Sequence, residues 1–229
     1  MELNADFSKR VSVHAAHIPW VPSPMAGVDR RMLDRIGDEV ARATSIVRYA
    51  PGSHFSPHTH GGGEELLVLD GEFSDEHGDF PAGSYIRNPP TSRHTPRSRP
   101  GCVLLVKLWQ FDLADRTQVR IQTGDRRFIP VAGRDGVTAL ELYRDPHENV
   151  RLERWAPNGT TRLAPSGGVE LLVVEGAFEE SGEHFEAQSW LRLPAGATLA
   201  ARTGPDGSTV WIKTGHLGRP ITSPTVTSA

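Results

Sequence analysis

The feature that most constrains this chain is an internal repeat spanning most of its 229 residues. Residues 48–52 (RYAPG) are matched by residues 154–158 (RWAPN), and residues 65–71 (ELLVLDG) by residues 170–176 (ELLVVEG). The offset is about 105 residues, the difference in number between Glu65 and Glu170. A repeat of that length is a whole small domain and not a solenoid unit. The chain is therefore predicted to hold two copies of one fold.

Each copy has the pattern of short strands joined by turns. Apolar runs at 43–49, 64–70 and 84–87 are typical of strands, and the longest run, 101–111, indicates a buried strand. The 23 glycines and 18 prolines supply the turns between them. Residues 30–37 fit either a short helix or a strand, and no segment has sustained helical periodicity. These observations predict an all-β fold.

Composition excludes several functions. The net charge is -3 and the pI is about 6.4, with no basic cluster beyond residues 93–99, so nucleic-acid binding is not expected. No apolar run is long enough to span a membrane, and the first ten residues do not resemble a signal peptide. The single cysteine, Cys102, agrees with a reducing compartment. We expect a cytoplasmic protein.

Two histidines of the first copy, His58 and His60, lie two residues apart. Alternate residues of an extended chain point to the same side, so both imidazoles can reach one point. Glycines 61–63 allow a sharp turn, Glu64 opens the next strand, and His94 follows a proline turn. Imidazole nitrogens and a carboxylate suit a divalent metal. The predicted metal ligands are therefore His58, His60, Glu64 and His94, with Glu64 favoured over Glu65 because adjacent strand residues face opposite sides.

The second copy keeps the strands and turns but loses these four polar residues. The alignment drops one residue in the glycine loop. It then places Ala164, Ser166, Val169 and Leu199 at the positions of His58, His60, Glu64 and His94. Because the repeated frame persists without the polar set, the fold does not require it. This contrast favours a functional role for the set.

The spacing of these residues resembles the two cupin motifs. Residues Gly52, His58, His60, Glu64 and Gly71 fit the first motif at every position, and Gly83, Pro89 and His94 fit the second. Thr91 and Ser98 depart from the glycine and the asparagine of the second motif. The resemblance implies a bicupin, two tandem double-stranded β-helix (jelly-roll) barrels, of which one binds metal and the other is degenerate.

Within the cupins, residues 20–111 resemble the ChrR-like group, which includes the C-terminal domain of ChrR-type zinc anti-sigma factors. The resemblance implies that the same two histidines, the glutamate and the later histidine hold the metal, with zinc as the implied ion. Those anti-sigma factors carry an N-terminal helical domain that grips the sigma factor. The first 40 residues here are too short for such a domain, so we do not expect this protein to bind a sigma factor.

Other residues near the motifs have two interpretations each. His54 lies an even number of residues from His58 and could point to the same side, but it is expected to face solvent. Tyr85 and Arg87 either line a pocket mouth or belong to the wall and surface, and Lys107 faces either the pocket or solvent. Trp109 and Cys102 are expected in the core. His14, His17, His77 and His184 are expected at the surface, while Trp155, Trp190 and Trp211 are expected to pack or, alternatively, to line an apolar cavity.

The ligand set leaves metal and function open. Four protein ligands would complete the coordination shell of Zn²⁺. Fe²⁺, Mn²⁺, Ni²⁺ or Cu²⁺ would keep open coordination positions for water or an organic chelate. One hypothesis is a metal-binding module related to small molecules or oxidative stress. The alternatives are a metal-dependent dioxygenase or isomerase, acting on a small dicarbonyl, phenol or hydroxy-ketone, and a structural zinc protein. The sequence predicts metal ligands but no catalytic residues.

The repeat also predicts domain limits. We expect an N-terminal arm at 1–19, a metal-binding barrel at 20–115, a degenerate barrel at 116–220 and a flexible tail at 221–229. Exposed strand edges and the arm favour a homodimer, which light scattering would test.

Overall fold

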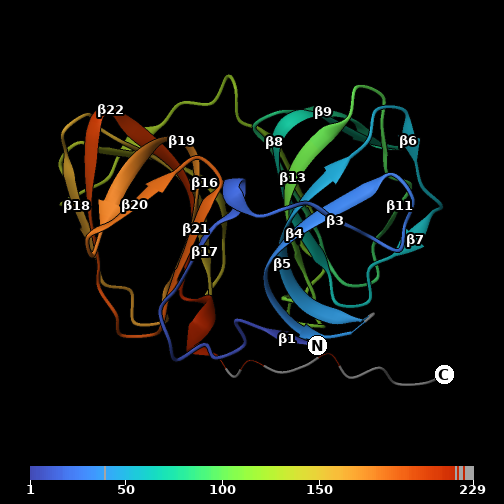
Figure 1. Ribbon diagram of the computed structural model, residues 1–229, viewed down its shortest axis with the longest axis horizontal. Coiled ribbons are helices and arrows are strands. Elements are labelled where there is room, and N and C mark those ends of the chain that lie inside the picture. Colours follow the sequence, from blue (N-terminus) through green and yellow to red (C-terminus); the bar gives the residue numbers. More distant parts are fainter. Residues whose placement is uncertain (39, 220, 222–223, 225–229) are drawn as a thin grey trace. The chain divides into compact units, whose positions relative to one another are not determined.

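The structure is a computed structural model, which describes residues 1–38, 40–219, 221 and 224. Its regular elements are strands, and the described residues add only two short 3₁₀ helices, η1 (Ala15–His17) and η2 (His216–Gly218). No described helix has the length and apolar character needed to cross a membrane. The predicted all-β class is confirmed (Figure 1).

The chain divides into two compact units. The leading unit comprises Met1–Ala5 and Pro19–Asp125, and the trailing unit comprises Asp6–Ile18 and Arg126–Ile221. The predicted arm, 1–19, is thus shared between the units. The change from one unit to the next falls ten residues beyond the predicted limit at 115, because a further strand precedes it. The predicted tail lies outside the described residues except for Ile221 and Pro224.

The leading unit is built on one large antiparallel sheet with the strand order β1-β4-β5-β13-β8-β10-β14. Two shorter ladders complete it: β11 pairs with β7, while β12 pairs with β6 and with the end of β8, which also pairs with β9. The strands are β1 (Glu2–Leu3), β3 (Val21–Pro22), β4 (Val28–Gly37), β5 (Ala41–Tyr49), β6 (Ser53–His54), β7 (His58–Thr59), β8 (Glu64–Asp75), β9 (Gly78–Pro81), β10 (Ser84–Asn88), β11 (Arg93–His94), β12 (Arg97–Ser98), β13 (Cys102–Leu108) and β14 (Val119–Gln122).

The trailing unit repeats this plan with the strand order β15-β16-β17-β22-β19-β21-β2, with β18 on β22 and β20 on β19. Its strands are β2 (Val11–His14), β15 (Ile129–Pro130), β16 (Val137–Arg144), β17 (Asn149–Trp155), β18 (Thr160–Leu163), β19 (Val169–Glu180), β20 (Glu183–Glu186), β21 (Ser189–Leu193) and β22 (Leu199–Thr214). In both units the long central strands curl into a barrel around an apolar interior (Figure 1).

Alternation along the strands decides which side chains fill each barrel. In β8, Leu66 and Val68 belong to the leading core, so Glu64 starts the same inward-facing row. Strand β8 continues beyond the predicted run 64–70 through Gly71, which has a φ of 71°. A Cβ there would collide with the carbonyl oxygen of Gly101, so glycine is needed for both reasons.

The edge strand of each barrel comes from a distant part of the chain. In the leading unit, β14 pairs with β10, and it lies in the segment that leads to the second copy. In the trailing unit the equivalent strand, β21, pairs instead with β2 from the N-terminus (Figure 1). Both additions cover backbone groups that a bare sheet edge would expose.

Several sequence-based predictions are refined by the structure. Residues 30–37, which fitted a helix or a strand, lie in strand β4. The apolar run 101–111 stops being a strand after Leu108, because Trp109 takes a φ of 58° and turns the chain. Residues 43–49, 64–70 and 84–87 lie in strands as predicted.

The register of the repeat differs from the sequence alignment at two sites. His58 lies opposite His94, and Leu163 lies opposite Leu199. The counterpart of His58 is therefore Leu163 and not Ala164, which makes Pro165 and not Ser166 the counterpart of His60. The extra residue of the first copy lies between β6 and β7, where strand β18 runs without a break.

Candidate metal centre

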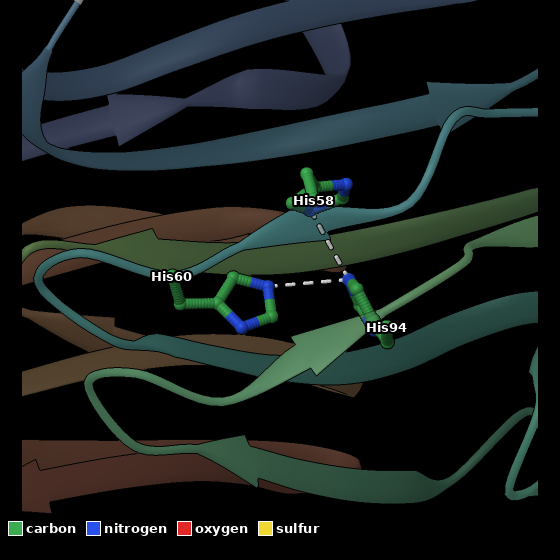
Figure 2. A group of neighbouring side chains, drawn as sticks. All are labelled: His58, His60 and His94. Atoms are coloured by element: carbon green, nitrogen blue, oxygen red, sulfur yellow. Dashed lines mark hydrogen bonds between the residues drawn. The ribbon is translucent and has the colours of Figure 1, made fainter.

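Four side chains from neighbouring elements meet at one end of the leading barrel. His58 on β7 is the cross-strand partner of His94 on β11, and Glu64 opens β8. His60 lies in the turn between β7 and β8, where its amide donates to Ser92 O and its carbonyl accepts from the amide of Thr91. Figure 2 shows the three imidazole rings converging. The structure therefore brings together the four residues that the sequence pattern singled out.

The spacing of the donor atoms suits a metal ion. The Nε2 atom of His94 lies 3.2 Å from the Nε2 atoms of both His60 and His58. Glu64 Oε2 lies 3.3 Å from His60 Nε2 and 3.5 Å from His94 Nε2. Metal–nitrogen bonds of about 2.0–2.1 Å separate neighbouring ligand atoms by about 3.0–3.4 Å. The cluster of three histidines can hold a metal ion, and the Glu64 carboxylate lies beside two of them.

The hydrogen bonds of His60 determine which nitrogen faces this point. His60 Nδ1 lies 2.9 Å from Ser92 Oγ, and the same hydroxyl donates to Pro89 O at 2.6 Å. Because its one proton is used on Pro89, the Ser92 hydroxyl accepts from Nδ1–H of His60. The Nε2 lone pair of His60 is then free to bind a cation.

The other three side chains are also held from behind. His58 Nδ1 lies 3.3 Å from Ser56 O, a carbonyl that can only accept, and His94 Nδ1 lies 3.4 Å from the buried Asp75 Oδ2. Asn88 Nδ2 donates to Glu64 Oε2 at 3.4 Å. Lone pairs and a carboxylate directed at one point repel one another without a cation. This arrangement of outer partners is typical of metal centres.

The protonation behaviour of the cluster follows from its charges. Burial alone would raise the pKa of Glu64, but the hydrogen bond to His60 and the neighbouring imidazoles lower it to about 2. Burial lowers the pKa of His58, with partial opposition from Glu64. Burial also acts to lower the pKa of His94, but its bond to Asp75 and the charge of Glu64 raise it overall. Glu64 is thus an anion throughout the physiological range.

The cluster is least covered at His58. His60 and His94 are buried, with 6% and 2% of their surface exposed, whereas His58 is half-buried.

The glycine turn also has a packing role that its sequence did not reveal. A Cβ on Gly62 would overlap the indole of Trp109, and one on Gly63 would lie 2.5 Å from the ring of Phe111. Trp109 thus packs on the turn that carries His60 and is not a purely internal core residue. The absence of side chains at 61–63 lets two aromatic rings cover the turn.

The remaining candidates lie away from the convergence point. Glu65 accepts a hydrogen bond from Tyr85, and Arg87 is buried against Asp115 at 2.6 Å. Lys107 is buried and donates to Thr44, so it does not reach solvent. The following residues lie as expected: His54 is exposed, Cys102 is buried with its pKa raised by burial to about 11, His17, His77 and His184 are exposed, and Trp155, Trp190 and Trp211 are buried. His14 is half-buried and bonded to Glu183 and Ser189, not freely exposed.

Sequence reasoning missed the three residues that hold the ligands from behind. Asp75, Asn88 and Ser92 carry no distinctive spacing, and their roles depend on strand register. One weak signal was present, because Asp75, Glu76 and His77 form a polar triplet whose donor atoms lie together at the end of β8.

Comparison with known proteins supports the class that the fold and the site define. The structure resembles a candidate dioxygenase from Nostoc punctiforme, with a TM-score of 0.77 and 13% identity over 97% of this chain and 88% of that one. It also resembles a candidate glyoxylate-induced protein from Pseudomonas aeruginosa (TM-score 0.71, 15% identity, 93% and 91% covered). Oxalate decarboxylase from Lactobacillus farciminis is similar too (TM-score 0.62, 12% identity, 93% and 87% covered). The fold is that of the cupins.

The sequence match agrees with this fold. Residues 8–112 match the ChrR cupin-like domain family. The resemblance stated from the motifs is confirmed. None of the curated proteins matches the chain.

Proposed function

We propose that the protein is a bicupin whose leading barrel binds one divalent metal ion through His58, His60, Glu64 and His94. The observation that carries this proposal is the convergence of side chains on His94, whose Nε2 atom lies 3.2 Å from Nε2 of both His58 and His60 and 3.5 Å from Glu64 Oε2. Glu64 Oε2 also lies 3.3 Å from His60 Nε2. The trailing barrel supports a different role, because apolar residues occupy the corresponding positions and fill its core. Its role is to pack, not to bind metal.

The metal-bound protein is proposed to bind a small oxygen-donor molecule at the side of the cluster nearest His58. A bound divalent metal would supply a Lewis acid that polarises the oxygens of such a molecule. The protein residues do the positioning: Ser92 fixes the tautomer of His60, Asp75 orients His94, and Asn88 restrains Glu64. Zinc is the ion that the ChrR-like family suggests, while iron, manganese and nickel also suit this ligand set.

A second candidate function is oxygen-dependent cleavage of a small dicarbonyl, phenolic or hydroxy-ketone compound. The incomplete burial of His58 favours it, because a closed structural zinc site would need no accessible side. The fold of the candidate dioxygenase from Nostoc punctiforme is compatible with this activity. The structural-zinc alternative predicts a metal that is held tightly and exchanges no ligand.

The deciding experiment is metal analysis of protein purified without added metal, followed by oxygen uptake with a panel of dicarbonyl compounds. One metal per chain is expected, and it should be absent from a variant in which His60 and His94 are both alanine. A wild-type protein that takes up no divalent metal from solution would contradict the proposal. Tightly held zinc without oxygen uptake would favour the binding module over the dioxygenase.

A further inference from the structure

Arg30 lies on strand β4 with its side chain on the inner face of the leading barrel. The register places Val28 opposite Tyr49, and Arg30 opposite Val47. Val28 and Val47 both belong to the apolar core of this unit, with Tyr49 packed against it. Because residues two apart on a strand share a face, Arg30 points inward with them.

The neighbouring charged residues of β4 confirm this direction. Arg31 stacks on Trp20 at 4.2 Å, and Arg48 stacks on the same ring at 4.6 Å while pairing with Asp29 at 2.7 Å. These contacts define the outer face of the sheet. Arg30 lies between Asp29 and Arg31 and therefore on the opposite face.

The inward-facing guanidinium of Arg30 is not neutralised within the protein. It makes no hydrogen bond or ion pair with any residue in the described part of the chain, and its Nε atom is buried without a hydrogen-bond partner. A second arginine of the same inner row, Arg35, is used by the β4–β5 turn, where it donates to the carbonyls of Gly37 and Asp38. The acids of the metal centre, Glu64 and Asp75, are engaged by histidines.

In the trailing barrel, by contrast, a buried acid is paired with arginines. Glu153 occupies the position that corresponds to Val47, and it is fully buried. It pairs with Arg134 at 2.7 Å and with Arg151 at 2.9 Å, and it accepts a hydrogen bond from Trp155. Buried charges are costly unless they are paired. The leading barrel keeps an inward arginine but lacks the acid.

We infer that Arg30 binds the carboxylate of a small organic acid whose oxygens coordinate the metal of the leading barrel. This inference rests on the proposed metal-binding function and specifies its ligand class. Strands β4 and β8 are three steps apart in the sheet, about 14 Å along its curved surface. The register sets Arg30 level with Val68, about 13 Å along β8 from Glu64. The arginine side chain, the acid, the metal and the Glu64 side chain together span this interval. Arginine suits the role because its planar fork matches a carboxylate.

The test compares two ligands with the same dicarbonyl group on zinc-loaded protein, using isothermal titration calorimetry. Acetylacetone is uncharged before it chelates, and acetylpyruvate carries a carboxylate in place of one terminal methyl group. We expect wild-type protein to bind acetylpyruvate at least about tenfold more tightly, since bonds between charged groups contribute this much or more. In Arg30→Met this preference should be lost, while zinc content and thermal unfolding should stay as in wild type.

Arg31→Met is the matched control, because it removes a guanidinium from the adjacent residue on the outer face. It should keep the preference for acetylpyruvate, and Arg30→Lys should keep part of it. Equal binding of the two ligands to wild-type protein, or binding of neither, would overturn the inference. So would a preference that survives in Arg30→Met. Failure of the wild-type protein to take up zinc would instead overturn the proposed function.

Discussion

The two barrels share a strand plan and differ in what their interiors hold. Where the leading barrel has His58, His60, Glu64 and His94, the trailing barrel has Leu163, Pro165, Val169 and Leu199. Val169 and Leu199 belong to the trailing core. The same backbone frame therefore supports either a polar cluster or a dry core. The difference teaches that the four polar residues are not part of what makes the barrel fold.

The two interiors also differ in how they treat buried charge. The trailing barrel buries an acid between two arginines, so its interior charges are paired. The leading barrel places valine at the equivalent position and leaves Arg30 facing inward without an acid. The interior charges of the trailing barrel are neutralised by its own residues, whereas we propose that those of the leading barrel are neutralised by a bound metal and its ligand.

The largest expected effect concerns the paired charges of the trailing barrel. Glu153→Ala would leave Arg134 and Arg151 without their shared buried partner, and we expect a loss of about 3–5 kcal/mol in unfolding free energy. Chemical denaturation measures it. Replacing Arg134, Arg151 and Glu153 together by apolar residues should restore most of the loss. A single variant as stable as wild type would show that the ion cluster is not needed.

The next effect separates the two barrels by metal affinity. Four ligands share a binding free energy of about 10–16 kcal/mol in structural zinc sites, so removing one should weaken binding by at least about 100-fold. We expect this for His94→Ala in a competition assay with a chelating dye. Leu199→Ala, at the matching position, should cost about 2–5 kcal/mol of stability and leave metal affinity unchanged. Equal metal affinities in the two variants would contradict the comparison.

A smaller effect is expected behind the metal centre. Asp75 orients His94, and loss of such an outer partner costs about 10- to 100-fold in metal affinity. Asp75→Asn should therefore weaken binding within that range, as measured by the same competition. The matching residue of the trailing barrel is Glu180, which pairs with Arg10. Glu180→Gln should leave metal affinity at the wild-type value.

The smallest effect distinguishes the edge strands of the two barrels by pH. Burial would raise the pKa of Glu183, but hydrogen bonds from Arg10, Ser12 and His14 lower it from 4.5 to about 2. A lowered pKa stabilises the folded state above about pH 4.5, and this contribution is lost as the pH falls towards 2. Strand β2, which carries Ser12 and His14, should lose protection from hydrogen exchange progressively between about pH 5 and about pH 2.

The C-terminal end of strand β14 is the internal control for this pH effect, because Gln122 in this strand and the following residue Thr123 donate to backbone carbonyls. These groups do not titrate in this range. Protection factors, corrected for intrinsic exchange, should fall for β2 and stay constant for β14. An equal fall in both strands would indicate general acid unfolding.

The sequence predicted those parts of the molecule that depend on local pattern. Alternating apolar residues predicted β5, β8 and β10, and the spacing of His58, His60 and Glu64 predicted their convergence, since parity along a strand determines direction. Asn88, Ser92 and Asp75 were not predicted, because their roles depend on which strands pair. The inward direction of Arg30 was not predicted either. It depends on two facts that the structure supplies: residue 30 lies in a strand, and its cross-strand partner is Val47.

The borrowed edge strands have a consequence for how this protein can be divided. Cutting the chain after residue 112, where the family match ends, would separate β10 from β14 and leave the second fragment without β2. Each piece would then present a long uncovered ladder, of the kind that promotes self-association. The smallest piece of this chain that keeps both barrels whole runs from the N-terminal strand to the end of the second copy. Although the sequence repeat resembles two separable domains, each barrel is completed by a strand from a distant part of the chain, so the two copies must be kept in one chain.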